Sequence, residues 1–140
     1  MNTFTLHILA PDRTFYDGEC ESLVVTTVDG KYGIMANHSN FIAAVVPGEL
    51  SYRTPDGETH YAAVSAGMVK SEDNDVLVLV ETAERPEEID ASRARAAADA
   101  AREAMMQKLS RREYYEMRVT LARAMSRLSV RNKRDTHKEI

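Results

Sequence analysis

The chain has 140 residues, 44% of them hydrophobic and 29% charged, with a formal net charge of −4 at pH 7. This length suits one domain with an appendage, and no uncharged apolar run is long enough to span a membrane. The N-terminus does not resemble a secretory signal, and the lone Cys20 cannot form an intrachain disulfide. We therefore expect a cytoplasmic protein.

The first 85 residues have the pattern of short strands separated by turns. Residues 3–8 alternate polar and apolar side chains, and residues 23–28 form a second expected strand that ends at a turn of Asp29 and Gly30. Two strand pairs follow, one around a Thr-Pro-Asp-Gly turn and one around a Glu-Asp-Asn-Asp turn. The ranges of these pairs are 50–53 with 59–64, and 68–70 with 76–80. The pattern predicts an antiparallel β-sandwich over residues 1–85.

Helix-forming residues replace the β-branched residues after residue 85. Asp90 is placed to cap a helix that runs to about residue 109, and Ser110 with Glu113 makes a capping-box pattern at the start of a second helix. We expect a helical hairpin over residues 89–131 and a charged, frayed tail over residues 132–140. The fold class is thus α+β, a β-sandwich followed by an antiparallel two-helix hairpin.

Each expected helix has one narrow apolar stripe with steps of three and four residues. The first stripe comprises Ala91, Ala94, Ala98, Ala101 and Met105, and the second comprises Tyr114, Met117, Leu121, Ala124 and Leu128. Alanine methyl groups bury little area, at most about 1 kcal/mol each. We therefore expect the helical hairpin to dock conditionally.

Charge differs between the two parts of the chain. Residues 1–88 hold 5 Lys or Arg and 15 Asp or Glu, a net charge of −10, whereas residues 89–140 hold 13 and 7, a net charge of +6. Such asymmetry indicates that the basic part contacts an acidic surface, either on its own sandwich or on a partner.

A search for catalytic motifs finds no glycine-rich phosphate loop, zinc-protease motif or nucleophile elbow. His38, between Asn37 and Ser39, is the one histidine in a context that suits a general base. An enzyme with His38 in a cleft of the sandwich is one alternative, but a loop histidine with no identifiable partner favours a structural role. We expect no catalytic residue, no metal site and no required cofactor.

Two pairs of residues suggest a phosphate ligand. Asp90 and Arg93 lie three residues apart at a helix N-terminus, and Arg123 and Arg127 lie four apart on the second helix. Guanidinium groups match phosphate oxygens, although an N-cap aspartate and a solvated arginine face explain the same pattern. The basic helices also suggest a nucleic-acid-binding module as an alternative. Because this part has only two aromatic residues for base stacking, an acidic protein partner is favoured.

A series of motifs resembles one family along nearly the whole chain. The motifs are ILAPDRTFY at 8–16, GKYGIMANH at 30–38, PG at 47–48, SAG at 65–67, ETAE at 81–84, Ile89-Asp90-x-x-Arg93-Ala94, and LARAMSRL at 121–128. Their order and spacing resemble the epsilon subunit of bacterial F-type rotary ATP synthases.

The resemblance implies a non-catalytic rotor subunit of the central stalk. Its sandwich would bind the gamma subunit and the c-ring, with Lys31, Tyr32, Gly33 and His38 in the contact loop. Its helical hairpin would fold down on the sandwich or extend toward the beta and alpha subunits, inhibiting ATP hydrolysis when extended. The protein would lie on the cytoplasmic face of the cell membrane, touch the membrane only through the complex and bind no nucleic acid.

The resemblance also implies ATP as a regulatory ligand. The family's ATP site maps onto Glu84, Ile89, Asp90, Arg93, Ala94, Arg123 and Arg127, with the carboxylates on the adenine and sugar side and the arginines on the phosphates. Bound ATP would hold the helical hairpin down. One position departs, because Ala100 stands where relatives that bind ATP well carry a further arginine. Such a loss costs on the order of 1 to 3 kcal/mol of binding free energy.

Overall fold

The computed structural model describes residues 2–138 and, within them, the side chains of residues 2–133. The strands are β1 (Phe4–Ala10), β2 (Arg13–Cys20), β3 (Ser22–Thr27), β4 (Gly30–Met35), β5 (Phe41–Val45), β6 (Gly48–Arg53), β7 (Thr59–Val64), β8 (Gly67–Glu72), β9 (Asp75–Val80) and β10 (Ala83–Glu84). They are followed by a short 3₁₀ helix, η1 (Pro86–Glu88), and two α-helices, α1 (Ala91–Met105) and α2 (Arg111–Lys138).

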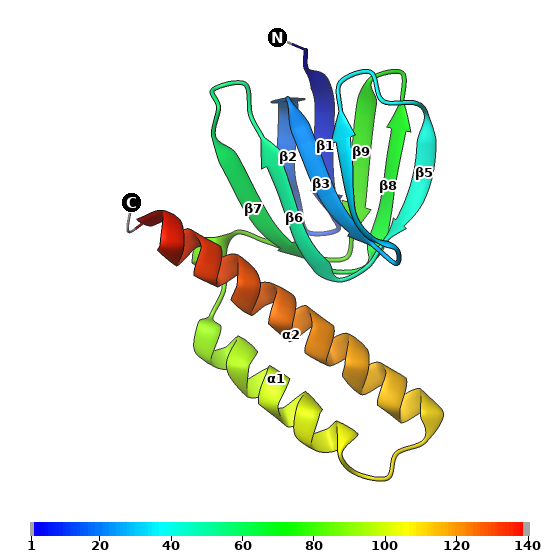
Figure 1. Cartoon of the computed structure of the whole chain (residues 1–140), viewed down its shortest axis with the longest axis vertical. Coiled ribbons are helices and arrows are strands. Elements are labelled where there is room, and N and C mark those ends of the chain that lie inside the picture. The colour runs from blue at the N-terminus through cyan, green and yellow to red at the C-terminus, as the bar shows by residue number, and fades with distance from the viewer. Residues whose placement is uncertain (1, 139–140) are drawn as a thin grey trace.

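The strands form two five-stranded sheets that pack face to face (Figure 1). The strand orders are β2-β1-β9-β8-β5 and β10-β7-β6-β3-β4, and every pair is antiparallel except β1 with β9. Phe4, Leu6 and Ile8 are buried in the core between the sheets, as the alternation in residues 3–8 predicts. The predicted class, a β-sandwich followed by two packed helices, is confirmed.

Both predicted strand pairs are present, with the turns that their sequences indicate. Gly57 has a φ of 87° in the turn between β6 and β7, a conformation that glycine adopts without strain. Asp73 and Asn74 have φ angles of 51° and 64° between β8 and β9, so this turn is of the type I′ class that matches strand twist. The turn chemistry in the sequence therefore fixes both registers.

The sequence predicts a contact loop around Lys31 and Gly33, but residues 30–35 form strand β4 instead. The strand pairs with β3 along its whole length, from Gly30 opposite Thr27 to Met35 opposite Ser22. Of its side chains only that of Ile34 is buried, so the sequence lacks the alternation that predicts a strand. Edge pairing, a tertiary effect, makes this segment a strand.

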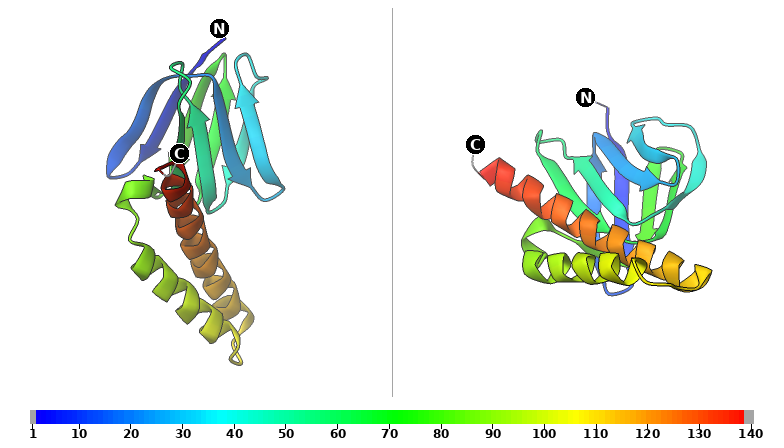
Figure 2. Two further views of the ribbon diagram at one scale, coloured as in Figure 1. Left: turned by 60° about the vertical axis from the view of Figure 1, so that its left-hand side comes forward. Right: turned by 60° about the horizontal axis from the view of Figure 1, so that its bottom comes forward.

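The two helices run antiparallel and pack through small residues, and α2 lies across one end of the sandwich (Figure 1, Figure 2). Ala94, Ala98 and Ala101 of the first stripe and Ala124 of the second are buried. Tyr114, expected on the second stripe, is 43% exposed. Tyr114 lies in the first turn of α2, next to the connection between the helices, where α1 offers little surface to cover it.

The helix boundaries differ from the expected ones at two ends. α1 ends at Met105 rather than near residue 109, because the residues before Ser110 are needed to reverse the chain. α2 continues to Lys138, so most of the expected tail is helical; no glycine or proline occurs there to stop it. Residues 139–140 of the expected tail lie outside the described residues. The N-cap at Asp90 and the Ser110–Glu113 capping box are both confirmed.

Candidate functional site

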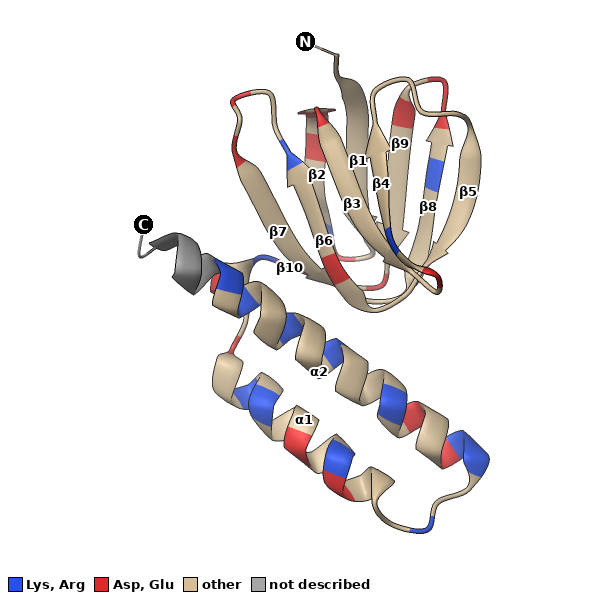
Figure 3. Ribbon diagram, in the orientation of Figure 1, with Lys and Arg blue, Asp and Glu red and all other residues tan. Residues whose placement is uncertain are grey.

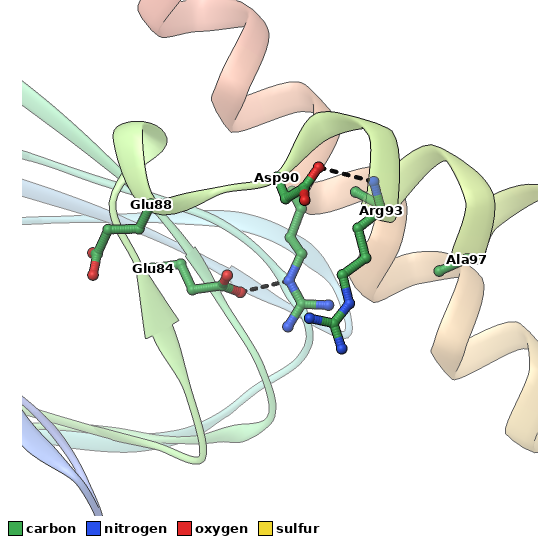
Figure 4. A pocket seen from close by; sticks show the side chains of 7 residues that line it. Glu84, Glu88, Asp90, Arg93 and Ala97 are labelled. Atoms are coloured by element: carbon green, nitrogen blue, oxygen red, sulfur yellow. Dashed lines mark hydrogen bonds and ion pairs between the residues drawn. The ribbon is translucent and has the colours of Figure 1, made fainter.

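A pocket of about 460 Å³ lies at the junction between the sandwich and the helices (Figure 4). Its lining comes from β10, η1, α1, α2 and the cap that precedes α1. The lining residues are Glu84, Glu88, Asp90, Arg93, Ala94, Ala97 and Arg127. The sequence predicted five of these seven as ligand contacts, namely all except Glu88 and Ala97. The volume is within the range typical of small-molecule sites.

The N-terminus of α1 forms one wall of this pocket. The Asp90 carboxylate accepts a hydrogen bond from the Arg93 backbone N–H at 3.1 Å, which fixes the first turn of the helix. Figure 4 shows the Arg93 side chain extending away from this cap toward the sandwich side. Within the described residues its guanidinium group has no hydrogen-bond or ion-pair partner. Arg93 is therefore a cation available to an anionic ligand.

Helix α2 contributes two arginines that are paired with carboxylates of the sandwich. Arg127 Nε lies 2.5 Å from Glu84 Oε1, and Arg123 Nη2 lies 3.4 Å from Glu81 Oε2. Arg123 lines a small cavity that adjoins the main pocket, and its Nε is buried without a hydrogen-bond partner among the described residues. The predicted arginine pair is thus near the pocket, but only Arg127 lines it.

Ile89, the remaining predicted contact, faces elsewhere. It is 4% exposed and packs in a small apolar cluster with Ala63 of β7 and Val130 of α2. This cluster joins the segment before α1 to both the sandwich and the second helix. Ile89 therefore contributes to docking of the helices rather than to the pocket surface.

Glu88 was not predicted, and its carboxylate accepts three hydrogen bonds. Arg13 Nη1 and Nη2 donate to its two oxygens at 2.7 and 3.0 Å, and the Arg85 backbone N–H donates at 2.8 Å. The Arg13 hydrogen bonds, with smaller contributions from Arg85, lower the pKa of Glu88 to about 2. The guanidinium groups of Arg13 and Arg85 also lie against the Phe15 ring. No sequence pattern could join Glu88 to a residue 75 positions away.

The α1 wall of the pocket carries alanine rather than a second cation on the face of Arg93. Ala97 and Ala100 lie four and seven residues after Arg93, so both are on the Arg93 face of α1. Ala97 lines the pocket, and Ala100 is exposed one turn beyond it. This wall carries no second positive charge.

The C-terminal half of α2 docks on the sandwich through a second carboxylate, Glu49 of β6. Its side chain is only 10% exposed and lies 2.5 Å from Lys133 Nζ, 3.3 Å from Ser129 Oγ and 4.0 Å from Lys31 Nζ. Figure 3 shows Lys and Arg along both helices, with α2 beside the sandwich. The acidic sandwich and the basic helices therefore contact each other within this chain.

Two of the predicted contact residues of the sandwich, Tyr32 and His38, form a separate group, whereas Lys31 lies beside Glu49. Tyr32 Oη lies 3.0 Å from His38 Nε2, and both rings contact Phe41. Met35 of β4 and Ile42 of β5 are 66% and 67% exposed on the outward sides of their strands. His38 bonds only a tyrosine and a backbone carbonyl among the described residues, so no acid or nucleophile makes it a catalytic base.

The described residues hold neither a candidate metal cluster nor a candidate membrane-spanning helix. No cluster of three or more His, Cys, Asp or Glu side chains there could hold a metal ion. No described helix is long and apolar enough to cross a membrane.

Comparison with known proteins places both modules in one family. Residues 3–86 match the β-sandwich domain of the ATP synthase delta/epsilon chain, and residues 87–132 match its long α-helix domain. The ATP synthase epsilon chain of Ruminiclostridium cellulolyticum is 42% identical over 134 residues, which cover 96% of this chain and 99% of that one. That of Ruminococcus albus is 38% identical, covering 96% and 100%.

Two solved structures share the fold. One is from the Euglena gracilis mitochondrial ATP synthase, with a TM-score of 0.81 and 20% identity over 90% of this chain and 79% of that chain. The other is from the central stalk and c-ring of the Tetrahymena thermophila mitochondrial ATP synthase, with a TM-score of 0.66 and 15% identity over 91% and 95%.

Proposed function

The chain belongs to the epsilon subunit family of the F-type ATP synthase, as a non-catalytic part of the central stalk, and we propose that its sandwich attaches it to the rotor while its helical hairpin regulates ATP hydrolysis. It takes part in ATP synthesis coupled to proton transport. A subunit that transmits torque needs stiffness and firm attachment rather than catalytic groups.

The sandwich is the part that binds the gamma subunit and the c-ring. The surface around Tyr32 and His38 supports this role because the Tyr32 ring, 39% exposed, lies against His38 and Phe41, and such aromatic groups are enriched in protein contacts. The subunit then sits at the cytoplasmic face of the bacterial membrane and reaches the membrane only through the complex.

The helical hairpin, residues 89–131, is the regulatory part, and α2 continues beyond it to Lys138. Its docked position depends on one small apolar cluster and a few ion pairs, so release from the sandwich costs little compared with unfolding the core. Once released, its basic face would bind acidic segments of the beta and alpha subunits and so block hydrolysis. Nothing catalytic is required of the subunit for this effect.

ATP is the regulatory ligand that suits the pocket. The observation that carries this proposal is that one pocket is lined by both modules, with Glu84 on the sandwich, Arg93 on α1 and Arg127 on α2. A ligand bound there contacts fixed and movable parts together, so it stabilises the docked state by its affinity for that state. The subunit requires no cofactor for its structural role.

Calorimetric titration of ATP into the isolated chain tests the nucleotide site. We expect saturable heat for the wild type and its loss in the Asp90→Ala, Arg93→Ala double variant, because that variant removes the cap and the unpaired guanidinium. Arg95→Ala is the matched control, since Arg95 is exposed on α1 and does not line the pocket. Absence of heat at millimolar ATP would refute the nucleotide site and leave rotor attachment unaffected.

A further inference from the structure

The pocket contains a carboxylate where a phosphate ligand is expected to bind. Arg127, which the nucleotide proposal assigns to phosphate, already has Glu84 Oε1 at 2.5 Å from its Nε. A carboxylate and a phosphate oxygen bind a guanidinium group in the same charge-assisted manner. Arg93, in contrast, has no side-chain partner within the described residues. The two pocket arginines are therefore unequal before any ligand arrives.

The backbone of Glu84 is held in place by the sandwich. It belongs to β10, where it pairs with Ala63 of β7, and its neighbour Ala83 is buried in the core. The side chains of Glu84 and Arg127 are 28% and 34% exposed, so solvent screens their attraction only in part. A phosphate that approaches Arg127 consequently meets a fixed negative charge within a few ångströms.

We propose that Glu84 takes the place of a phosphate at Arg127, so that it holds α2 on the sandwich and competes with phosphate ligands for that guanidinium group. This inference rests on the proposed nucleotide site and assigns Glu84 a role opposite to a ligand contact. It allows the helices to dock before any nucleotide binds, and it lowers the affinity of the pocket for polyphosphates.

A second carboxylate makes such an exchange of partners feasible without undocking. Glu49 holds the last turns of α2 through Lys133 and Ser129, and the buried Val130 lies on the same stretch of helix. When a phosphate displaces Glu84 from Arg127, these contacts still keep α2 on the sandwich. Glu84 therefore adds to docking and sets ligand affinity, whereas Glu49 and Val130 keep α2 docked when a phosphate displaces Glu84.

Titration of inorganic tripolyphosphate into the full chain tests this inference, because this probe has no base or sugar that Glu84 might orient. We expect Glu84→Gln to bind tripolyphosphate about tenfold more tightly than the wild type, since the variant removes the competing charge. Glu87→Gln is the control. It removes the same charge three residues from Glu84, but the Glu87 side chain lies outside the pocket. Its affinity should stay within about twofold of the wild type.

Three outcomes contradict the inference in distinguishable ways. Unchanged or weaker tripolyphosphate binding by Glu84→Gln overturns the competition, while the nucleotide site stands if ATP still binds and the Asp90→Ala, Arg93→Ala variant does not. An equal gain in Glu87→Gln would show a general charge effect and also overturn it. No binding of tripolyphosphate or ATP by either the wild type or Glu84→Gln overturns both proposals. Hydrogen exchange of α2 verifies that each variant remains docked.

Discussion

Truncation of Val130 to alanine should release the helical hairpin without unfolding the sandwich. The Val130 side chain is fully buried, at 0% exposure, against Ala63 of β7 and Ile89 of the connecting segment. The substitution removes two methyl groups and leaves a cavity, which costs about 2 kcal/mol. Because these contacts exist only in the docked state, the ratio of docked to undocked molecules should fall by about thirtyfold.

Energy transfer between dyes at Asp56→Cys and Met106→Cys measures this ratio in the isolated chain. Both positions are exposed, on the sandwich and near the end of α1, and the native Cys20 is buried beyond the reach of the label. Val28→Ala makes the same truncation at a side chain that is 78% exposed and should leave the signal unchanged. A Val130→Ala variant that stays docked while its sandwich melts at a lower temperature would refute the reasoning, since Val130 would then support the core.

Three further predictions concern the pocket, the sandwich and pH. Ala100→Arg should tighten ATP binding ten- to a hundredfold by calorimetry, because it adds a cation to the Arg93 face of α1; an unchanged affinity would contradict this placement. Gly67→Ala should destabilise the sandwich by about 3 kcal/mol or more in urea, since its Cβ would meet a backbone oxygen at 1.9 Å, whereas Gly33→Ala meets nothing within 4 Å. The pKa of Glu88 is lowered from 4.5 to about 2, so its bond to Arg13 should stabilise the fold above pH 4.5 and progressively less as the pH falls toward 2. The difference in urea stability between wild type and Glu88→Gln should shrink over that window, and a constant difference would contradict the assignment.

Local chemistry made much of the fold predictable from the sequence. The alternation in residues 3–8, the turns around Gly57 and Asn74, and the Asp90 cap each depend on neighbours within a few residues. The extension of α2 to Lys138 follows from the lack of glycine or proline there, whereas strand β4 was missed because pairing with β3 decides it. Such tertiary effects leave no periodic signal in the segment itself.

The candidate site likewise has one part that the sequence predicts and one part that only the folded chain shows. Asp90 and Arg93 are adjacent in sequence, so their shared position at a helix start could be predicted. The partners that alter their chemistry come from distant segments, as in the pairs of Glu88 with Arg13 and of Arg127 with Glu84. A sequence motif indicates which cations belong to a site, but only the folded chain shows which of them are already paired with a carboxylate.

Removal of the helical hairpin from the assembled ATP synthase tests the central claim most directly. A chain that ends after Ile89 retains the sandwich, with its surface around Tyr32, and the Glu88–Arg13 contacts. ATP hydrolysis by the purified complex should rise severalfold while the truncated subunit still copurifies with the rotor and ATP synthesis still depends on the ion gradient. Hydrolysis that stays at the level of the intact complex would contradict the regulatory role of the helical hairpin, and loss of the subunit from the complex would contradict attachment through the sandwich.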